Sequence, residues 1–93
     1  KDIAYLGAII GRVANRIQDA KSKIRGVMYT FDKNECSKQT LHGGSKSCAF
    51  QDWKIKNTTD TSVTFILDEP DGHMGFPGNI HFLIWPHLPI LFY

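Results

Sequence analysis

Polar and apolar residues alternate in two parts of this chain of 93 residues. Residues 22–24 and 27–31 alternate on the two sides of a turn at Gly26, and residues 53–56 and 62–67 alternate on the two sides of a longer polar turn. Alternation with a period of two residues is typical of strands that bury one face. The pattern therefore predicts two antiparallel hairpins, with Gly26 supplying the tight turn of the first.

The other segments are less regular. Residues 3–10 are apolar and β-branched, which predicts either a short strand or an extended entry segment that ends at Gly11. Residues 32–39 form a polar loop. Residues 80–93 are largely apolar but contain two prolines, which exclude this tail from the centre of a sheet. At fourteen residues the tail is also shorter than the roughly twenty that a membrane span needs.

A histidine stands in a glycine turn between two predicted strands, in the run Thr40-Leu41-His42-Gly43-Gly44. Glycine has no Cβ, so the backbone at Gly43 and Gly44 can adopt φ > 0 and lie close to another chain or a ligand. The residues alone leave two interpretations of His42 open. It is either a hydrogen-bonded loop residue or an imidazole that is presented to a ligand.

Composition excludes some classes of protein. The length suits one domain with a small core, because a chain of this size buries only ~60–65% of the surface that its unfolded form exposes. Eleven basic and nine acidic residues give a net charge of +2, and the basic residues are scattered. This argues against nucleic-acid binding. The acidic run Asp68 to His73 matches no spacing typical of calcium or zinc ligands, so we predict no metal site.

Cysteine usage and the chain ends bear on location. Cys36 and Cys48 lack the paired spacing of a disulfide scaffold or metal site, so we predict reduced thiols. No signal peptide is visible at the start, which favours a cytoplasmic location. The sequence begins at Lys1 and stops at Tyr93 inside an apolar run. We therefore expect that both ends are cut.

Three motifs occur in order along the chain. They are Gly7-Ala8-Ile9-Ile10-Gly11-Arg12-Val13-Ala14-Asn15-Arg16-Ile17, Leu41-His42-Gly43-Gly44 followed by Trp53, and Pro70-Asp71-Gly72-His73-Met74-Gly75-Phe76-Pro77-Gly78. Together they resemble the N-terminal part of the aldose 1-epimerase (galactose mutarotase) family. The resemblance extends from about Tyr5 to Asn79. Residues 47–50 depart from the family pattern. We predict that the Trp53 indole lies in the core and not against a sugar.

The resemblance implies an all-β fold. The chain would be a fragment of a large antiparallel β-sandwich, the galactose mutarotase-like supersandwich. Residues 1–93 would form the N-terminal portion of one aldose 1-epimerase domain, with 80–93 as an apolar tail that does not follow the family pattern. The implied activity is the interconversion of the α and β anomers of hexoses such as galactose and glucose by acid/base ring opening.

The resemblance also implies a binding site. Asn15, Arg16 and His42 match the sugar-contacting positions, and His42 would assist proton transfer. The main catalytic acid and base of the family lie outside this chain, so no catalytic residue is assigned. No metal and no organic cofactor are implied. The expected partner is a small-molecule hexose, without nucleic acid or membrane, and the oligomeric state is open. A non-catalytic carbohydrate-binding protein of the same fold and an inactive fragment remain alternatives.

Overall fold

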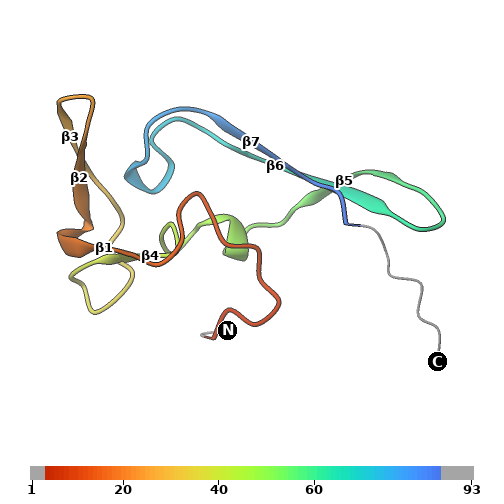
Figure 1. The fold of residues 1–93 in the computed structure, drawn as a ribbon, viewed down its shortest axis with the longest axis horizontal. Helices are drawn as coiled ribbons and strands as arrows, with labels where there is room; N and C mark the ends of the chain where they lie inside the picture. The colour runs from red at the N-terminus through yellow and green to blue at the C-terminus, as the bar shows by residue number, and fades with distance from the viewer. Residues whose placement is uncertain (1–3, 87–93) are drawn as a thin grey trace.

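Short antiparallel strands make up the computed structural model, which describes residues 4–86 (Figure 1). The strands are β1 (Arg16–Ile17), β2 (Lys21–Ile24), β3 (Val27–Thr30), β4 (Thr40–Leu41), β5 (Lys54–Thr58), β6 (Val63–Glu69) and β7 (Ile80–Ile84). Three 3-10 turns separate them, namely η1 (Gln18–Ala20), η2 (Cys48–Phe50) and η3 (His73–Gly75). No α-helix occurs in the described residues, so none there could span a membrane. The predicted all-β class is confirmed.

Both predicted hairpins are present. β2 pairs with β3 from Lys21 opposite Thr30 to Ile24 opposite Val27, and Gly26 has the positive φ, 81°, that its turn requires. β5 pairs with β6 across the polar turn, with an irregularity in β5 between Ile55 and Asn57. The apolar tail contributes β7, which adds to the free edge of β6. Its last residues, 87–93, lie outside the described residues.

Of the two alternatives for residues 3–10, the strand is wrong for the part that the structure describes. That part contains turns and no strand. Tyr5 and Gly7 have φ values of 55° and 74°, which lie outside the β region, so a strand cannot run through them. The segment is anchored by a side chain, because the Cys48 thiol donates a hydrogen bond to the carbonyl of Ile9 at 3.3 Å.

The histidine turn also differs from prediction on one side. β4 precedes His42 as expected, but the residues that follow the glycines form loops and η2 before β5 begins. The backbone therefore turns after His42 instead of continuing as a strand. Trp53, which comes next, packs its ring at 5.8 Å from that of Phe82 and donates its indole N–H to the Cys48 carbonyl at 2.9 Å. The Trp53 indole thus packs against other residues of this chain.

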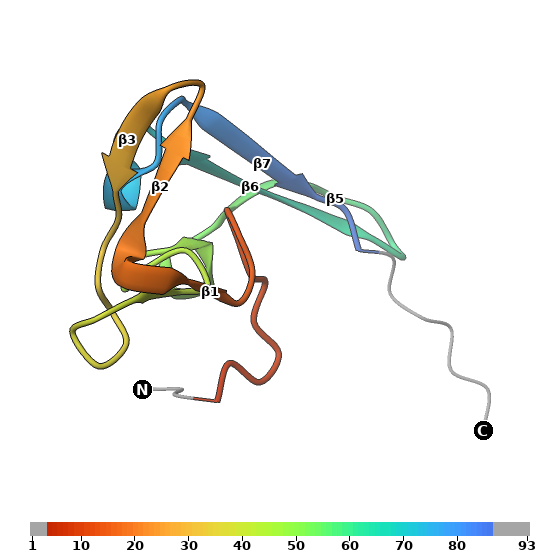
Figure 2. The ribbon, with the colours of Figure 1, turned by 60° about the vertical axis from the view of Figure 1, so that its left-hand side comes forward.

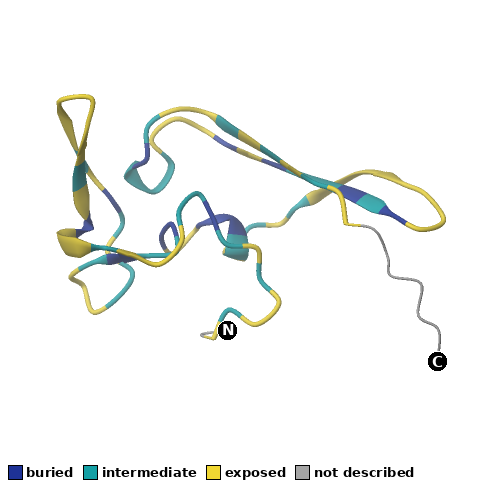
Figure 3. Ribbon diagram, viewed as in Figure 1, coloured by how far each residue is buried: buried dark blue, intermediate teal, exposed yellow. Residues whose placement is uncertain are grey.

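The core is small and lies where the hairpin β2–β3 meets the turns after β6. It centres on Phe31, which stacks on Phe76 with ring centroids 4.3 Å apart, and on fully buried Ala20. Figure 2 shows this hairpin beside the end of β6 and the start of β7. Buried residues gather mainly at such meeting points, whereas both hairpin tips are exposed (Figure 3). Distant segments are therefore joined at a few contacts and not over a broad interior.

Candidate functional site

The short ladder between β1 and β4 brings the predicted binding residues together. Arg16 pairs with Leu41 and Ile17 with Thr40, so Asn15 and His42 lie side by side at the end of the ladder. The His42 amide donates to the Asn15 carbonyl at 2.9 Å, and the Asn15 amide donates to Nδ1 of His42 at 2.9 Å. Two segments that are far apart in sequence thus form one polar unit, and it contains all three predicted residues.

The hydrogen bond from Asn15 determines how His42 can act. Because Nδ1 accepts a main-chain N–H, the proton of the neutral imidazole must lie on Nε2. Within residues 4–86, no hydrogen-bond partner of Nε2 is present. Tyr5 packs edge-on against the ring, with centroids 4.8 Å apart, and fixes its plane. His42 therefore presents one N–H donor in a defined direction.

Asn15 and His42 share an unusual backbone conformation. Their φ values are 65° and 52°, in the left-handed region that residues with a Cβ seldom adopt. Such conformations persist only where the surroundings hold them, and they are concentrated at functional sites. Here the two reciprocal hydrogen bonds supply that support. Seven other described non-glycine residues also have positive φ, so the orientation of His42 is defined by its hydrogen bond at Nδ1 and not by φ.

Arg16 lies beside this unit and is held by Glu35. Its Nε and Nη2 both donate to the Glu35 carboxylate, the latter at 2.9 Å, while Nη1 donates to Asn15 Oδ1 at 3.3 Å. Gln39 donates a further hydrogen bond to Glu35. The hydrogen bond from Arg16 lowers the pKa of Glu35, and the same contact raises the pKa of Arg16. The Arg16 side chain remains about half exposed, at 52%.

Glu35 was not predicted from the sequence. It is one acidic residue in a polar loop, at a position that no periodicity distinguishes. Only the turn that closes the loop reveals its place, because Glu35 and Gln39 form a bridge that directs the carboxylate toward β1. The pattern of polar residues offers no signal for such a contact.

The two glycines after His42 are required by close packing. Gly43 and Gly44 have φ of +86° and +107°. A Cβ at Gly43 would lie 2.9 Å from the carbonyl carbon of Gly11 and overlap its oxygen, and a Cβ at Gly44 would lie 2.9 Å from the Met74 side chain. The glycines therefore do permit a close approach of the backbone. Its partners are other segments of this chain.

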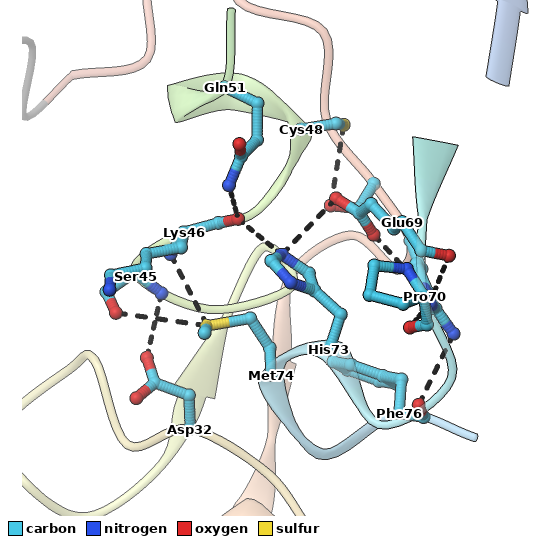
Figure 4. A network of polar contacts seen from close by, with 12 residues as sticks. Asp32, Ser45, Lys46, Cys48, Gln51, Glu69, Pro70, His73, Met74 and Phe76 are labelled. Atoms are coloured by element: carbon cyan, nitrogen blue, oxygen red, sulfur yellow. Dashed lines mark hydrogen bonds and ion pairs between the residues drawn. The ribbon is translucent and has the colours of Figure 1, made fainter. Parts of the chain in front are cut away.

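A network of polar contacts supports the loop that follows the glycines (Figure 4). Lys46 is its centre, because its carbonyl oxygen lies 2.6 Å from Nε2 of His73 and accepts a hydrogen bond from Gln51 at 2.7 Å. The Lys46 amide contacts the Met74 sulfur at 3.4 Å, and Asp32 accepts from the neighbouring Ser45 amide at 2.8 Å. The loop is thereby fixed against η3.

Arg12 connects this region to the three-stranded sheet. Its Nε lies 3.1 Å from Glu69 Oε1, and its terminal nitrogens donate to the carbonyls of Pro70 and Pro77 at 2.9 and 3.0 Å. Both charged side chains are buried, at 9% and 2% exposed. His73 lies 3.6 Å from the second oxygen of Glu69. Glu69 and His73, which stand in the acidic run, are thus engaged in structural contacts.

The two cysteines have different surroundings, and neither forms a disulfide. Cys36 is exposed in the polar loop, and Cys48 is buried in η2, where its thiol contacts the Ile9 and Gly11 carbonyls. Burial raises the pKa of the Cys48 thiol to about 11, and the nearby charge of Glu69 adds to this effect. The described residues contain no group of three or more acidic, His or Cys side chains that could hold a metal ion.

Comparison with known proteins shows the family. A sequence profile described as aldose 1-epimerase matches residues 1–88, so the chain belongs to the aldose 1-epimerase family. It is 42% identical over 77 residues to aldose 1-epimerase of Escherichia coli (strain K12), covering 83% of this chain and 22% of that protein. It is 37% identical over 76 residues to human galactose mutarotase, covering 82% of this chain and 22% of that protein.

Solved structures show the same fold. The crystal structure of the GalM/aldose epimerase homologue from C. elegans superimposes with a TM-score of 0.81 and 28% identity, over 90% of this chain and 26% of that chain. Galactose 1-epimerase from Lactobacillus acidophilus NCFM gives 0.73 and 23%, over 91% and 26%. The galactose mutarotase fold is confirmed. The chain spans about a quarter of the length of these relatives.

Proposed function

We propose that this chain supplies part of the sugar-binding site of an aldose 1-epimerase, which interconverts the α and β anomers of hexoses such as galactose and glucose. One observation carries the proposal, namely the reciprocal hydrogen-bonded unit of Asn15 and His42 with Arg16 beside it. Family membership supports it independently. The main acid and base are expected outside this chain, so the activity belongs to the complete protein.

The donors in this unit suit a sugar. A hexose presents hydroxyl and ring oxygens, each of which can accept a hydrogen bond. His42 presents Nε2–H, and Arg16 retains terminal N–H groups that Glu35 does not engage. In anomer exchange, a base removes the proton of the anomeric hydroxyl while an acid protonates the ring oxygen, which opens the ring. We infer that His42 donates to the region of the ring oxygen and assists this change of charge.

Replacing His42 tests this role. In the complete protein, His42→Ala should lower kcat/KM for mutarotation by about 10² or more, because an assisting proton donor is lost. The melting temperature should change little. His81→Ala is the control, since His81 is an exposed histidine paired with Asp68 on the sheet. Polarimetry of freshly dissolved α-D-galactose gives the rate. Full activity together with a lowered melting temperature would assign His42 a structural role.

Replacing Arg16 by lysine tests the binding role of the guanidinium. Arg16→Lys should weaken sugar binding although the charge is kept, because lysine lacks the planar fork of donors. Affinity for galactose and glucose is measured by isothermal calorimetry. Arg25→Lys at the exposed tip of the first hairpin is the control. An unchanged dissociation constant for both sugars would remove Arg16 from the site.

The chain alone should not catalyse the reaction. Contacts that are made equally to the ground state and the transition state lower KM without raising kcat. We therefore expect that the 93-residue chain leaves the mutarotation of α-D-glucose at the buffer rate, as followed by polarimetry. Acceleration that scales with chain concentration and disappears in His42→Ala would show that residues of this chain, such as Asp68 or Asp71, perform the proton transfers.

A further inference from the structure

The contact between Glu35 and Arg16 divides the guanidinium into an occupied side and a free end. A guanidinium has five N–H donors. Glu35 takes the Nε donor and one donor of Nη2, and Asn15 takes one donor of Nη1. One N–H therefore remains on each terminal nitrogen. A pair of donors on the two terminal nitrogens of a guanidinium can bind two neighbouring hydroxyl oxygens.

Glu35 itself is held firmly enough to set this orientation. Its carboxylate receives a second hydrogen bond from the Gln39 side chain. Its main chain closes a turn, because the Gln39 amide donates to the Glu35 carbonyl at 3.2 Å and the Glu35 amide donates to the Gln39 carbonyl at 3.2 Å. The side chain is only 21% exposed. This turn leads directly into β4 and His42, so Glu35 belongs to the same structural unit as the candidate site.

Glu35 also changes the charge of the site. The pair of Arg16 and Glu35 has no net charge. An unpaired guanidinium, in contrast, binds carboxylate and phosphate groups in a bidentate manner. A negatively charged ligand at this place would have to displace Glu35 or lie beside it. Repulsion of a wrong ligand is an established route to specificity. Lys33 and Lys38 in the same loop line a separate hollow with Lys21.

We propose that Glu35 is a specificity-determining residue of this site: by pairing with Arg16 it presents the end of the guanidinium to neighbouring sugar hydroxyls and makes the site select neutral sugars over anionic ones. The inference rests on the proposed function. It assigns a positioning role to Glu35, since the carboxylate acts through Arg16. Sugar acids and sugar phosphates are the classes of ligand that this residue excludes.

The test compares two sugars that differ in charge. D-Galactose and D-galacturonate differ at C6, where the second has a carboxylate. Their dissociation constants are measured by isothermal calorimetry for the complete protein and for Glu35→Gln. We expect that Glu35→Gln tightens galacturonate binding about tenfold and weakens galactose binding about threefold or less. The gain for galacturonate should shrink in 0.5 M salt, because the site is exposed to solvent and salt screens exposed charges.

Two further variants make the result specific. Asp60→Asn, which removes one negative charge at the exposed turn between β5 and β6, should leave the ratio of the two dissociation constants unchanged. Glu35→Asp keeps the charge but shortens the side chain, so it should still reject galacturonate while galactose binding weakens. Thermal unfolding of each variant checks that it folds.

Three outcomes would count against the inference. If Glu35→Gln still binds galactose and the ratio of the galacturonate and galactose dissociation constants does not change, the role of Glu35 is overturned and the proposed function is left intact. An equal change of the ratio in Asp60→Asn would reduce the effect to net charge and would also overturn it. A wild-type protein that binds no hexose would overturn the proposed function itself, and the inference with it.

Discussion

The surroundings of His42 and the sheet β5–β6–β7 are stabilised in different ways. Around His42, side chains bind main-chain groups that come from distant parts of the sequence. In the sheet, the backbone ladder carries the structure, and large apolar side chains remain exposed, with Ile55 at 62% and Leu83 at 51%. One region thus depends on particular residues, and the other depends on a repeating pattern.

This difference determines where the molecule is sensitive to substitution. A ladder bond is made by the backbone of any residue except proline, so a strand tolerates most exchanges on its exposed face. A side-chain contact to a buried group has one suitable donor, and its removal leaves a polar or charged partner without compensation. We therefore expect large effects from substitutions that break buried contacts, such as those of Arg12 and Gly43, and small ones at exposed positions.

The largest effect is expected at Arg12, which joins the two regions. Arg12→Ala leaves the buried Glu69 carboxylate without its partner, which costs about 3–5 kcal/mol of folding free energy in comparable pairs. Urea unfolding of the complete protein measures the loss. Arg25→Ala on the exposed hairpin tip is the control and should change stability by about 0.5 kcal/mol or less. A loss at Arg12 as small as that control would mean that the ion pair does not join the regions.

The second effect is expected at Gly43. Gly43→Ala adds a Cβ that overlaps the main chain of Gly11, so the two segments must separate, at a cost of about 3 kcal/mol. Gly26→Ala is a matched control, because Gly26 also has a positive φ, +81°, but nothing lies within 4 Å of an added Cβ. That control should cost only about 1 kcal/mol. Equal losses in urea unfolding would show that φ alone accounts for both.

The third effect is a dependence on pH. The pKa of Cys48 is raised from 9.0 to about 11 in the folded protein, so above pH 9 the unfolded chain releases a proton that the folded protein keeps. Stability should therefore be constant below pH 9 with respect to this group and fall between pH 9 and about 11, by on the order of 2 kcal/mol. Cys48→Ala should lose this slope and Cys36→Ser should retain it. Identical slopes in all three proteins would contradict the assignment.

The smallest effect on stability is expected on the exposed face of the sheet. Leu83→Thr should change the free energy of unfolding by about 0.5 kcal/mol or less, because the side chain is half exposed and threonine suits a strand. The same exchange at buried Leu67 should cost about 2 kcal/mol or more. We also expect Leu83→Thr to reduce self-association of the isolated chain in sedimentation velocity, since exposed apolar patches promote it. If self-association does not change, residues other than Leu83 cause it.

Sequence patterns predicted the two hairpins because the information is local. The alternation of each strand and the turn between them lie within a few residues, and pairing follows from them. The segment of residues 3–10 shows the limit of this reasoning. Its apolar, β-branched composition is that of a strand, but the structure places turns at Tyr5 and Gly7, and local composition does not encode them.

The candidate site was predicted in part. Asn15, Arg16 and His42 were identified through the family resemblance, and the structure brings them together. Glu35 and Arg12 were missed, since their partners lie 19 and 57 residues away and no local period marks them. Side-chain pairs of this kind depend on how the strands and turns are placed in space. They become visible only when the fold is known.

The contacts of Arg12 also have a consequence for synthesis on the ribosome. Its most distant partner, the carbonyl of Pro77, is synthesised 65 residues after Arg12. At a rate of roughly 5–20 residues per second, the guanidinium spends roughly 3–13 seconds in water before that partner exists. We therefore expect that the nascent chain can complete its β2–β3 hairpin and β1–β4 ladder early, whereas the contacts of Arg12 and the contact of the Lys46 carbonyl with His73 form only after the turns beyond β6 have emerged.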